Sequence, residues 1–249
     1  MTADGVYVYA ITPAGTALPA GQGGVGSPPA RLRTVRRGRL AAVVSDAPPD
    51  LRARRRDLLA HQDLLLRLMD EGPVLPMRFG MVAAGQDTVE QQLAAGEDGH
   101  LAALKRIAGC HEINVKALAA EDALADVIAE DSTVRKLREA ARRRPGYEAS
   151  LRLGEAVAAS LARRAAEAGR RVLRELTPRA RAVAAGPEVQ GCALNVSFLV
   201  EREAGDAFLA EARRFAGEHR GHVELRLAGP LPCYSFVSAE ARPVPVGGG

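Results

Sequence analysis

The chain has 249 residues, of which 47% are hydrophobic, and this length favours two domains over one. Its 34 basic and 30 acidic residues leave a net charge of +4, which is too mild to require nucleic acid as a partner. Three cysteines lie far apart, without the C-x-x-C spacing of a zinc site or the density of a disulfide framework. No apolar run reaches about 18 residues and no leader-like start is present, so we expect a cytoplasmic chain without a membrane span.

The first part of the chain predicts strands joined by one unusual loop. Residues 6–11, VYVYAI, are uncharged and rich in β-branched and aromatic side chains, which indicates a buried strand. Residues 32–37 and 40–45 predict a hairpin that turns at Gly38. Between these elements, residues 12–30 hold five glycines and four prolines. This composition predicts a segment that is either mobile or ordered only by a partner.

A helix is predicted over residues 51–70, and its inner face carries a histidine. Apolar residues at helical spacing define that face: Leu51, Leu58, Leu65 and Met69. His61 lies on the same stripe, with Asp57 one turn earlier. His61 is therefore either a general base oriented by Asp57 or a core histidine satisfied by its neighbours. The second interpretation is favoured, because no serine, cysteine or lysine nucleophile stands at a predictable position beside it.

Residues 73–81 predict the next strand, with Pro76 at an edge or a bulge. Arg78 is the lone charge in this apolar run, and a buried charge requires a partner. Asp57 is one candidate partner, with Asp63 and Glu71 as others. We thus expect a structural polar cluster of Asp57, His61 and Arg78. The same three residues define the alternative function, a small-molecule enzyme, although no phosphate-binding, dinucleotide, serine-hydrolase or zinc-protease motif is present.

The remaining pattern predicts an α+β protein of two domains. A helical region over 86–108, broken near Gly96 and Gly99, completes an N-terminal α/β domain of residues 1–109. A second domain, 110–240, begins with a half-solvated strand over 110–118, and 241–249 form a disordered tail. The later elements follow in chain order: helices within 121–144, one long amphipathic helix over 147–176, a strand or last turn at 178–185, a strand at 193–200, a helix at 204–219 and a strand at 223–227. This order is that of a modified ferredoxin-like (split βαβ) fold.

The closing segment, residues 229–237, reads GPLPCYSFV. Its two prolines remove backbone donors and hold the chain extended, so residues 233–237 predict a short edge strand. Tyr234 and Phe236 would then share one face. That face either packs against the domain or docks another chain. The candidate partner-binding residues are Pro230, Leu231, Tyr234 and Phe236.

Taken together, these motifs resemble the gas vesicle accessory family usually called GvpL/GvpF over nearly the whole chain. The resemblance rests on segments in the same order: VYVYAI at 6–11, LAAVVS at 40–45, the helix containing His61, VLPMRFG at 74–80, EINVK at 112–116, PGY at 145–147, LNVSFLV at 194–200 and GPLPCYSFV at 229–237. The closing motif departs from the family pattern, since Leu231 and Cys233 replace a tryptophan and a second proline. Loss of the tryptophan weakens this spot as a docking anchor.

The resemblance implies a minor component or assembly factor of gas vesicles rather than an enzyme. Its implied partners are the small hydrophobic shell protein and other accessory proteins, and its implied location is the cytoplasm, in association with the vesicle. No cofactor or metal is expected. RNA binding is also disfavoured, because aromatic residues make up only 4% of the chain and no aromatic RNA-binding strand motif is present.

Overall fold

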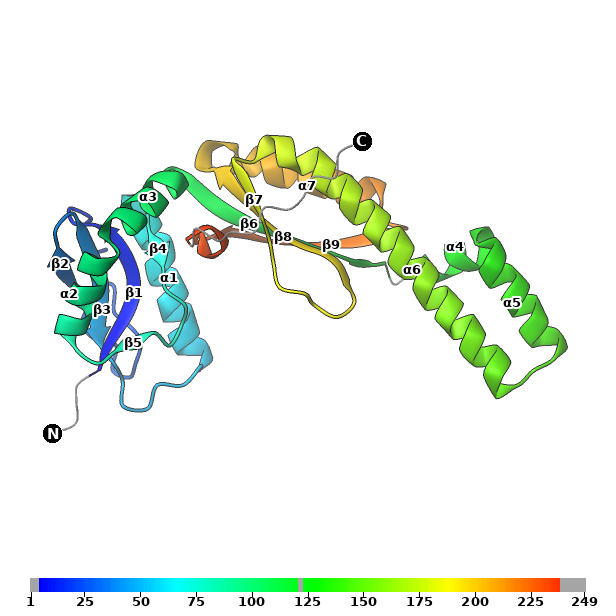
Figure 1. Ribbon diagram of the computed structural model, residues 1–249, viewed down its shortest axis with the longest axis horizontal. Coiled ribbons are helices and arrows are strands. Elements are labelled where there is room, and N and C mark those ends of the chain that lie inside the picture. The colour runs from blue at the N-terminus through cyan, green and yellow to red at the C-terminus, as the bar shows by residue number, and fades with distance from the viewer. Residues whose placement is uncertain (1–4, 121–122, 238–249) are drawn as a thin grey trace. The chain divides into compact units, whose positions relative to one another are not determined.

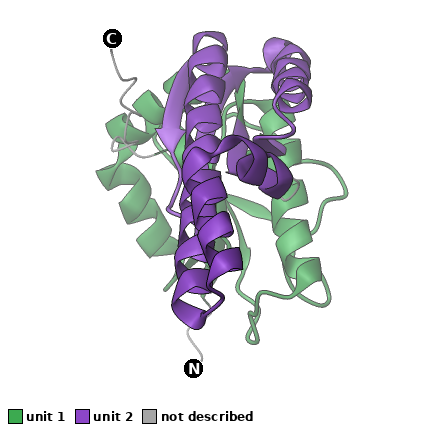
Figure 2. Cartoon of the chain, turned by 90° about the vertical axis from the view of Figure 1, so that its right-hand side faces the viewer, with its two compact units in different colours: residues 1–112, 230–241 green, residues 113–229, 242–249 purple. Residues whose placement is uncertain are grey.

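The computed structural model describes residues 5–120 and 123–237, which fall into two compact units (Figure 1, Figure 2). Unit 1 comprises the described residues of 1–112 and 230–241, and unit 2 comprises those of 113–229. The closing segment therefore groups with unit 1, whereas the sequence-based division after residue 109 places it in the second domain. The expected disordered tail, 241–249, lies outside the described residues.

Unit 1 is built on an antiparallel sheet. Its strands are β1 (Val6–Pro13), β2 (Arg33–Arg37), β3 (Leu40–Asp46), β4 (Leu75–Pro76) and β5 (Val82–Ala83). The order is β2-β3-β1-β4, with β5 also pairing with β1. The predicted hairpin is confirmed, since Arg37 pairs with Leu40 around Gly38, whose φ of 56° suits glycine. Strand β1 is buried along nearly its whole length because helices cover both of its faces.

Three helices complete unit 1: α1 (Arg55–Glu71), α2 (Gln86–Ala95) and α3 (Glu97–Ile107). On one face of the sheet, the α1 residues Leu64, Leu65 and Leu68 pack against the side chains of β1. Val8, on the opposite face of β1, lies instead against residues of α2. The predicted break at Gly96 is confirmed, whereas the one at Gly99 is wrong, because Gly99 lies inside α3. Leu58 is exposed, so its assignment to the inner face of α1 is wrong.

The single strand predicted over 73–81 is also wrong. Pairing with β1 is confined to the two residues of β4 and the two residues of β5, and the chain turns between them. Pro76 contributes no N–H to the ladder, and after it only the Met77 N–H still donates to β1, to the Tyr9 carbonyl at 2.8 Å, before the chain turns. Arg78 lies in that turn and is exposed, so it needs no buried partner.

Unit 2 combines the second sheet with helices. The elements from residue 110 to residue 231 are β6 (Cys110–Ala119), α4 (Ala123–Glu130), α5 (Ser132–Arg143), α6 (Tyr147–Leu176), β7 (Ala182–Ala185), β8 (Cys192–Glu201), α7 (Gly205–Glu218) and β9 (Val223–Leu231). The strand order is β7-β8-β6-β9. The first three residues of β6 and the last two of β9 belong to unit 1. The expected sequence of strand, helices, two strands, helix and strand is thus present.

The long helix α6 has two different environments. Its C-terminal half buries Ala168, Val172 and Leu176, and the last two join Phe198 and Phe208 in the core above the sheet. Its N-terminal half extends past the sheet and packs against α4 and α5 (Figure 1). The predicted apolar stripe is therefore confirmed, but only its second half lies over the sheet.

The closing segment is not a strand beyond Leu231. Residues Tyr234–Phe236 form a 3₁₀ turn. The carboxylate of Glu112 accepts hydrogen bonds from the Ser235 N–H and the Ser235 hydroxyl, both at 2.8 Å. Arg106 donates to the Phe236 carbonyl at 2.9 Å. These contacts hold the Phe236 side chain inside unit 1, where it is 2% exposed.

We expect Phe236→Ala to lower the free energy of unfolding of unit 1 by about 3–5 kcal/mol, because it removes a fully buried ring and leaves a cavity. Three of the four tyrosines, Tyr7, Tyr9 and Tyr234, lie in unit 1, so urea unfolding followed by tyrosine fluorescence reports this unit. Leu59→Ala is the matched control, since Leu59 is exposed on α1 and should cost less than about 1 kcal/mol. Equal effects of the two substitutions would contradict the buried turn.

Candidate functional site

Two tyrosines of β1 form the centre of a buried polar cluster in unit 1. Tyr7 and Tyr9 are two residues apart and face the same side of the sheet, with ring centroids 4.6 Å apart. The register of β1 against β3 shifts between Val8 and Ala10, which is the signature of a bulge at Tyr9. Both rings are fully buried beneath α1, so their hydroxyls must find partners inside the unit.

His61 of α1 joins this cluster through both of its ring nitrogens. Nε2 lies 3.0 Å from the Met77 carbonyl oxygen, and Nδ1 lies 2.9 Å from the Tyr7 hydroxyl. Because a carbonyl only accepts, the neutral ring carries its proton on Nε2, and Nδ1 accepts from Tyr7. The Tyr7 hydroxyl in turn accepts from the Gly80 N–H at 3.1 Å. One histidine and one tyrosine thereby hold both sides of the turn between β4 and β5.

The Tyr9 hydroxyl makes a second chain of hydrogen bonds. Ser45 donates its hydroxyl proton to the Asp46 carbonyl, so Tyr9 donates to Ser45 Oγ at 2.9 Å. The same Tyr9 oxygen accepts from the Val25 N–H at 2.8 Å. Thus Tyr9 links strand β3 to the glycine-rich segment of residues 12–30.

The glycine-rich segment is ordered by its own chain. Asp57, buried at the start of α1, accepts from the Gly26 N–H at 2.9 Å. Val25 is fully buried in the same core. A Cβ on Gly24 would overlap the Tyr9 hydroxyl, so this close approach requires glycine. The expectation that the segment is mobile or ordered only by a partner is therefore wrong.

Burial keeps the histidine and the tyrosines of the cluster neutral. It lowers the pKa of His61, an effect that the hydrogen bond with the Met77 carbonyl partly offsets. It raises the pKa of both Tyr7 and Tyr9, and it raises the pKa of Tyr234 to about 12. His61 is 3% exposed, and both of its ring nitrogens are hydrogen-bonded. It therefore connects α1 to Tyr7 and Met77 and is not placed to act as a base.

The structure brings some of the predicted site residues together and separates others. Asp57 and His61 lie in the cluster, but Arg78 does not join them. Tyr234 packs against the same core, although the sequence assigns it to a different site. Of the other closing residues, Phe236 is buried, Leu231 is half-buried and Pro230 is exposed. Direct partner contact through this segment stays a prediction, and Pro230 is its most accessible member.

Sequence reasoning missed an apolar surface beside this cluster. Met81 and Val82 are 50% and 47% exposed, so two large apolar side chains that are adjacent in the chain lie at the surface. They border a small cavity of about 80 Å³ whose walls include Val8 of β1 and Leu93 of α2. Pro76 and Gly80 could have indicated it, because these two residue types favour a turn, and a turn here directs the apolar residues that follow toward solvent.

Comparison with known proteins connects this arrangement to one family. The profile described as "Gas vesicle synthesis protein GvpL/GvpF" matches residues 5–238. The chain belongs to the GvpL/GvpF family. Gas vesicle protein F of Streptomyces sp. (strain CB03234) is 42% identical over 235 residues, which cover 93% of the chain and 98% of that protein. Gas vesicle protein L of the same strain is 35% identical over 127 residues, which cover 45% of the chain and 47% of that protein.

Solved GvpF structures share the fold of this GvpL/GvpF protein. Gas vesicle protein GvpF from Microcystis aeruginosa matches with a TM-score of 0.73 at 21% identity, covering 94% of the chain and 99% of that structure. GvpF from Anabaena sp. PCC7120 matches with a TM-score of 0.75 at 22% identity, covering 95% and 99%. These likenesses confirm the mixed helix and sheet architecture. Membership of the family confirms the expected resemblance and implies a gas vesicle accessory role.

Two further observations concern the described part of the chain alone. Every helix within residues 5–120 and 123–237 is too short or too polar to cross a membrane. Over the same residues, no three or more His, Cys, Asp or Glu side chains are grouped so that they would hold a metal ion.

The depressed pKa of His61 predicts how stability depends on pH. The unfolded chain binds a proton near the ordinary pKa of 6.5 while the folded chain does not, so the free energy of unfolding falls as the pH drops below that value. The slope for one such group approaches ~1.4 kcal/mol per pH unit. Unit 1 unfolding at a series of pH values measures it.

His100 contributes to the same slope, because burial lowers its pKa as well. We expect His61→Gln and His100→Gln each to reduce the slope, and the double variant to reduce it further. A slope unchanged by His61→Gln would contradict the neutral, buried state of that ring.

Proposed function

We propose that this protein binds the small hydrophobic shell protein of gas vesicles during vesicle nucleation and assembly, together with other accessory proteins, in the cytoplasm and in association with the vesicle. The observation that carries the proposal is the family match over residues 5–238, which extends across both units. A shell subunit with a large apolar surface aggregates unless another protein covers it or pairs with its edges. An accessory protein that offers an apolar surface meets this requirement.

The apolar surface of Met81 and Val82 is the proposed contact in unit 1. Val82 belongs to β5, which pairs with β1 in a ladder of only two residues. A partner strand added beside so short an element would extend the sheet, while its side chains cover Met81 and Val82. The neighbouring cavity of about 80 Å³ has room for a small apolar group of the partner.

The His61 cluster supports this contact by fixing the turn that carries it. His61 holds the Met77 carbonyl and Tyr7 holds the Gly80 N–H, so both ends of the residues before Met81 are hydrogen-bonded to the core. A surface that is already ordered loses less conformational entropy on binding. We therefore assign the cluster a positioning role in partner recognition.

The closing segment is proposed as a second contact in the same unit. Pro230 and Leu231 end an edge strand and are at least partly accessible. Tyr234 and Phe236 support them from inside rather than meeting the partner. In unit 2, the strand order β7-β8-β6-β9 with crossing helices supports the proposed modified ferredoxin-like domain that carries the long helix.

Co-expression with the shell protein of the same gene cluster tests the proposal. We expect the wild-type protein to keep the shell protein in the soluble fraction and to co-purify with it. Met81→Asp combined with Val82→Asp should reduce the co-purified shell protein by about tenfold or more, which is the effect of losing a hot-spot contact. Charged side chains at these exposed positions leave the core of unit 1 in place.

The matched control places aspartates on an apolar pair in unit 2 that is at least as exposed, Tyr147→Asp with Leu151→Asp. These side chains are 85% and 48% exposed. The control variant should retain the shell protein at the wild-type level. Failure of the wild-type protein to associate would overturn the proposed function, and retention by the Met81/Val82 variant would move the contact to another surface.

A further inference from the structure

A groove between α4 and α5 in unit 2 combines an apolar floor with a basic rim. Its floor is formed by Ala125, Ile128 and Ala129 of α4, and its rim by Arg135, Arg138, Glu139 and Arg142 of α5. The groove has a volume of about 580 Å³. Both helices lie beside the N-terminal half of α6, beyond the end of the sheet (Figure 1).

The floor exists because α4 is apolar around most of its circumference. Its sequence, ALADVIAE, has apolar side chains at six of eight positions, yet only Ala123 and Val127 are buried. A helix that is apolar on all sides is normally covered on all sides. Here Ala125 and Ala129 face solvent, and Leu124 is also exposed. No second helix covers the exposed side of α4 among the described residues, although the Arg135 side chain of α5 reaches it and donates to the Ala129 carbonyl at 3.3 Å.

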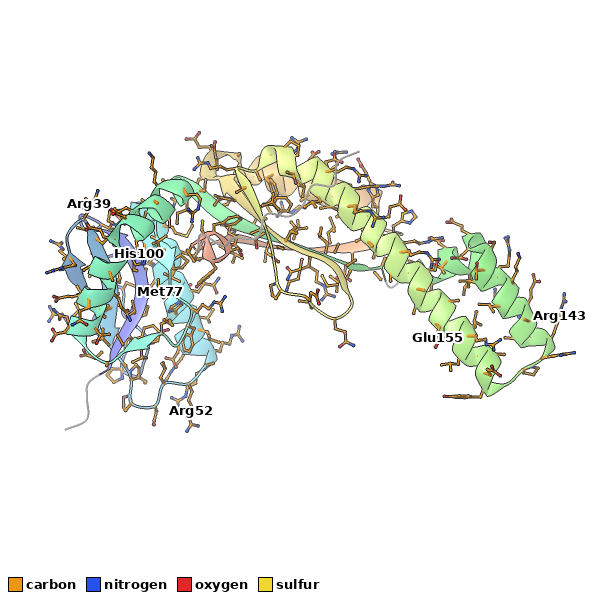
Figure 3. All side chains as sticks on the ribbon, in the orientation of Figure 1. Arg39, Arg52, Met77, His100, Arg143 and Glu155 are labelled. Atoms are coloured by element: carbon orange, nitrogen blue, oxygen red, sulfur yellow. The ribbon has the colours of Figure 1, made fainter. Side chains whose placement is uncertain are left out.

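The rim carries a net positive charge, because three arginines lie there beside one carboxylate, that of Glu139. Helix α5 has five basic residues and one acidic residue. Arg138 and Arg142 have no ionic or hydrogen-bonded partner in the described part of the chain, and Figure 3 shows the Arg143 side chain projecting outward from the end of α5. The arginines of α6 behave differently, since several pair with carboxylates: Arg152 with Glu148, Arg163 with Asp131, Arg164 with Glu130 and Arg171 with Glu167.

We propose that this groove binds an acidic amphipathic helix of a partner protein. The apolar stripe of that helix would cover Ala125, Ile128 and Ala129, and its carboxylates would meet Arg138 and Arg142. Positions 135, 138 and 142 are spaced by three and four residues, so they form one row about 10 Å long on α5. A partner helix presents carboxylates at the same spacing. The complex would be a three-helix arrangement of α4, α5 and the partner.

The apolar floor favours a protein helix over a nucleic acid. Phosphate groups are bound by charge and hydrogen bonds, and they gain nothing from three aliphatic side chains. The aromatic side chains that stack bases are also missing from the groove lining. This binding surface lies on residues other than Met81 and Val82, so it adds a second partner to the proposed function.

Fluorescence anisotropy with the full-length protein tests the proposal. The probe is a labelled synthetic peptide of about 14 residues, or four helical turns, with leucines on one face and glutamates along both borders of that face. One control peptide has lysine in place of every glutamate, and another has the acidic composition in scrambled order. A labelled single-stranded RNA is the fourth probe. We expect saturable binding of the acidic amphipathic peptide alone, weakened but not abolished by added salt.

Paired charge reversals locate the site. Arg138→Glu with Arg142→Glu should weaken peptide binding by at least about tenfold. Arg52→Glu with Arg55→Glu, at two exposed positions of unit 1, makes the same change in net charge and should leave binding unchanged. Ile128→Gln, which alters the floor without altering charge, should also weaken binding. Retention of the shell protein by the Arg138/Arg142 variant separates this site from the Met81 surface.

Three results would overturn the inference. These are no binding of the acidic peptide, equal binding of the scrambled peptide, and equal loss of binding in the two charge-reversal variants. RNA binding that depends on Arg138 and Arg142, without binding of the acidic peptide, would assign the groove to nucleic acid instead. Circular dichroism of each variant establishes that the helices are intact.

Discussion

Two buried phenol hydroxyls on one strand determine how the irregular part of unit 1 is arranged. A buried hydroxyl without a partner costs about 1–3 kcal/mol, so Tyr7 and Tyr9 must each be satisfied within the unit. Tyr7 is satisfied by His61 and the Gly80 N–H, and Tyr9 by Ser45 and the Val25 N–H. Segments from four distant parts of the sequence therefore meet at β1. Four of the eight segments that bear the resemblance to the family meet here: 6–11, 40–45, the helix containing His61 and 74–80.

In each unit, a well-packed core supports an exposed surface that is proposed to bind a partner. In unit 1, the core holds the turn that exposes Met81 and Val82, so a well-ordered network underlies the proposed contact with the shell protein. In unit 2, α6 is anchored on the sheet by its C-terminal half, while its N-terminal half supports α4 and α5. The basic groove lies on those two helices and is lined by exposed residues of α4, among them Ala125 and Ala129. An assembly factor with two such surfaces would hold a shell subunit and a second partner on one chain.

Much of the fold follows from local sequence patterns. The predictions fail where contacts with residues far away in the sequence determine the local structure. The hairpin, the break at Gly96 and the whole of α6 were predictable from periodicity and turn residues. Leu58 was misplaced because helical spacing gives only the angle around α1, which Leu58 shares with the buried Leu65, whereas Leu58 lies in the first turn of the helix and is left exposed there. Tyr234 and Phe236 alternate as in a strand, but Glu112, far away in sequence, caps that segment as a turn. The glycine-rich segment was misjudged because its partners, Tyr9 and Asp57, leave no local signal.

Amide hydrogen exchange tests most directly whether the tyrosine hydroxyls hold these segments. The account predicts slow exchange of the Val25 and Gly80 N–H groups, although both lie outside regular structure. Tyr7→Phe should release Gly80 and leave Val25 protected, whereas Tyr9→Phe should do the reverse. Exchange of both amides in the wild-type protein at the rate of an unfolded peptide would contradict the account. So would equal loss of protection in the two variants.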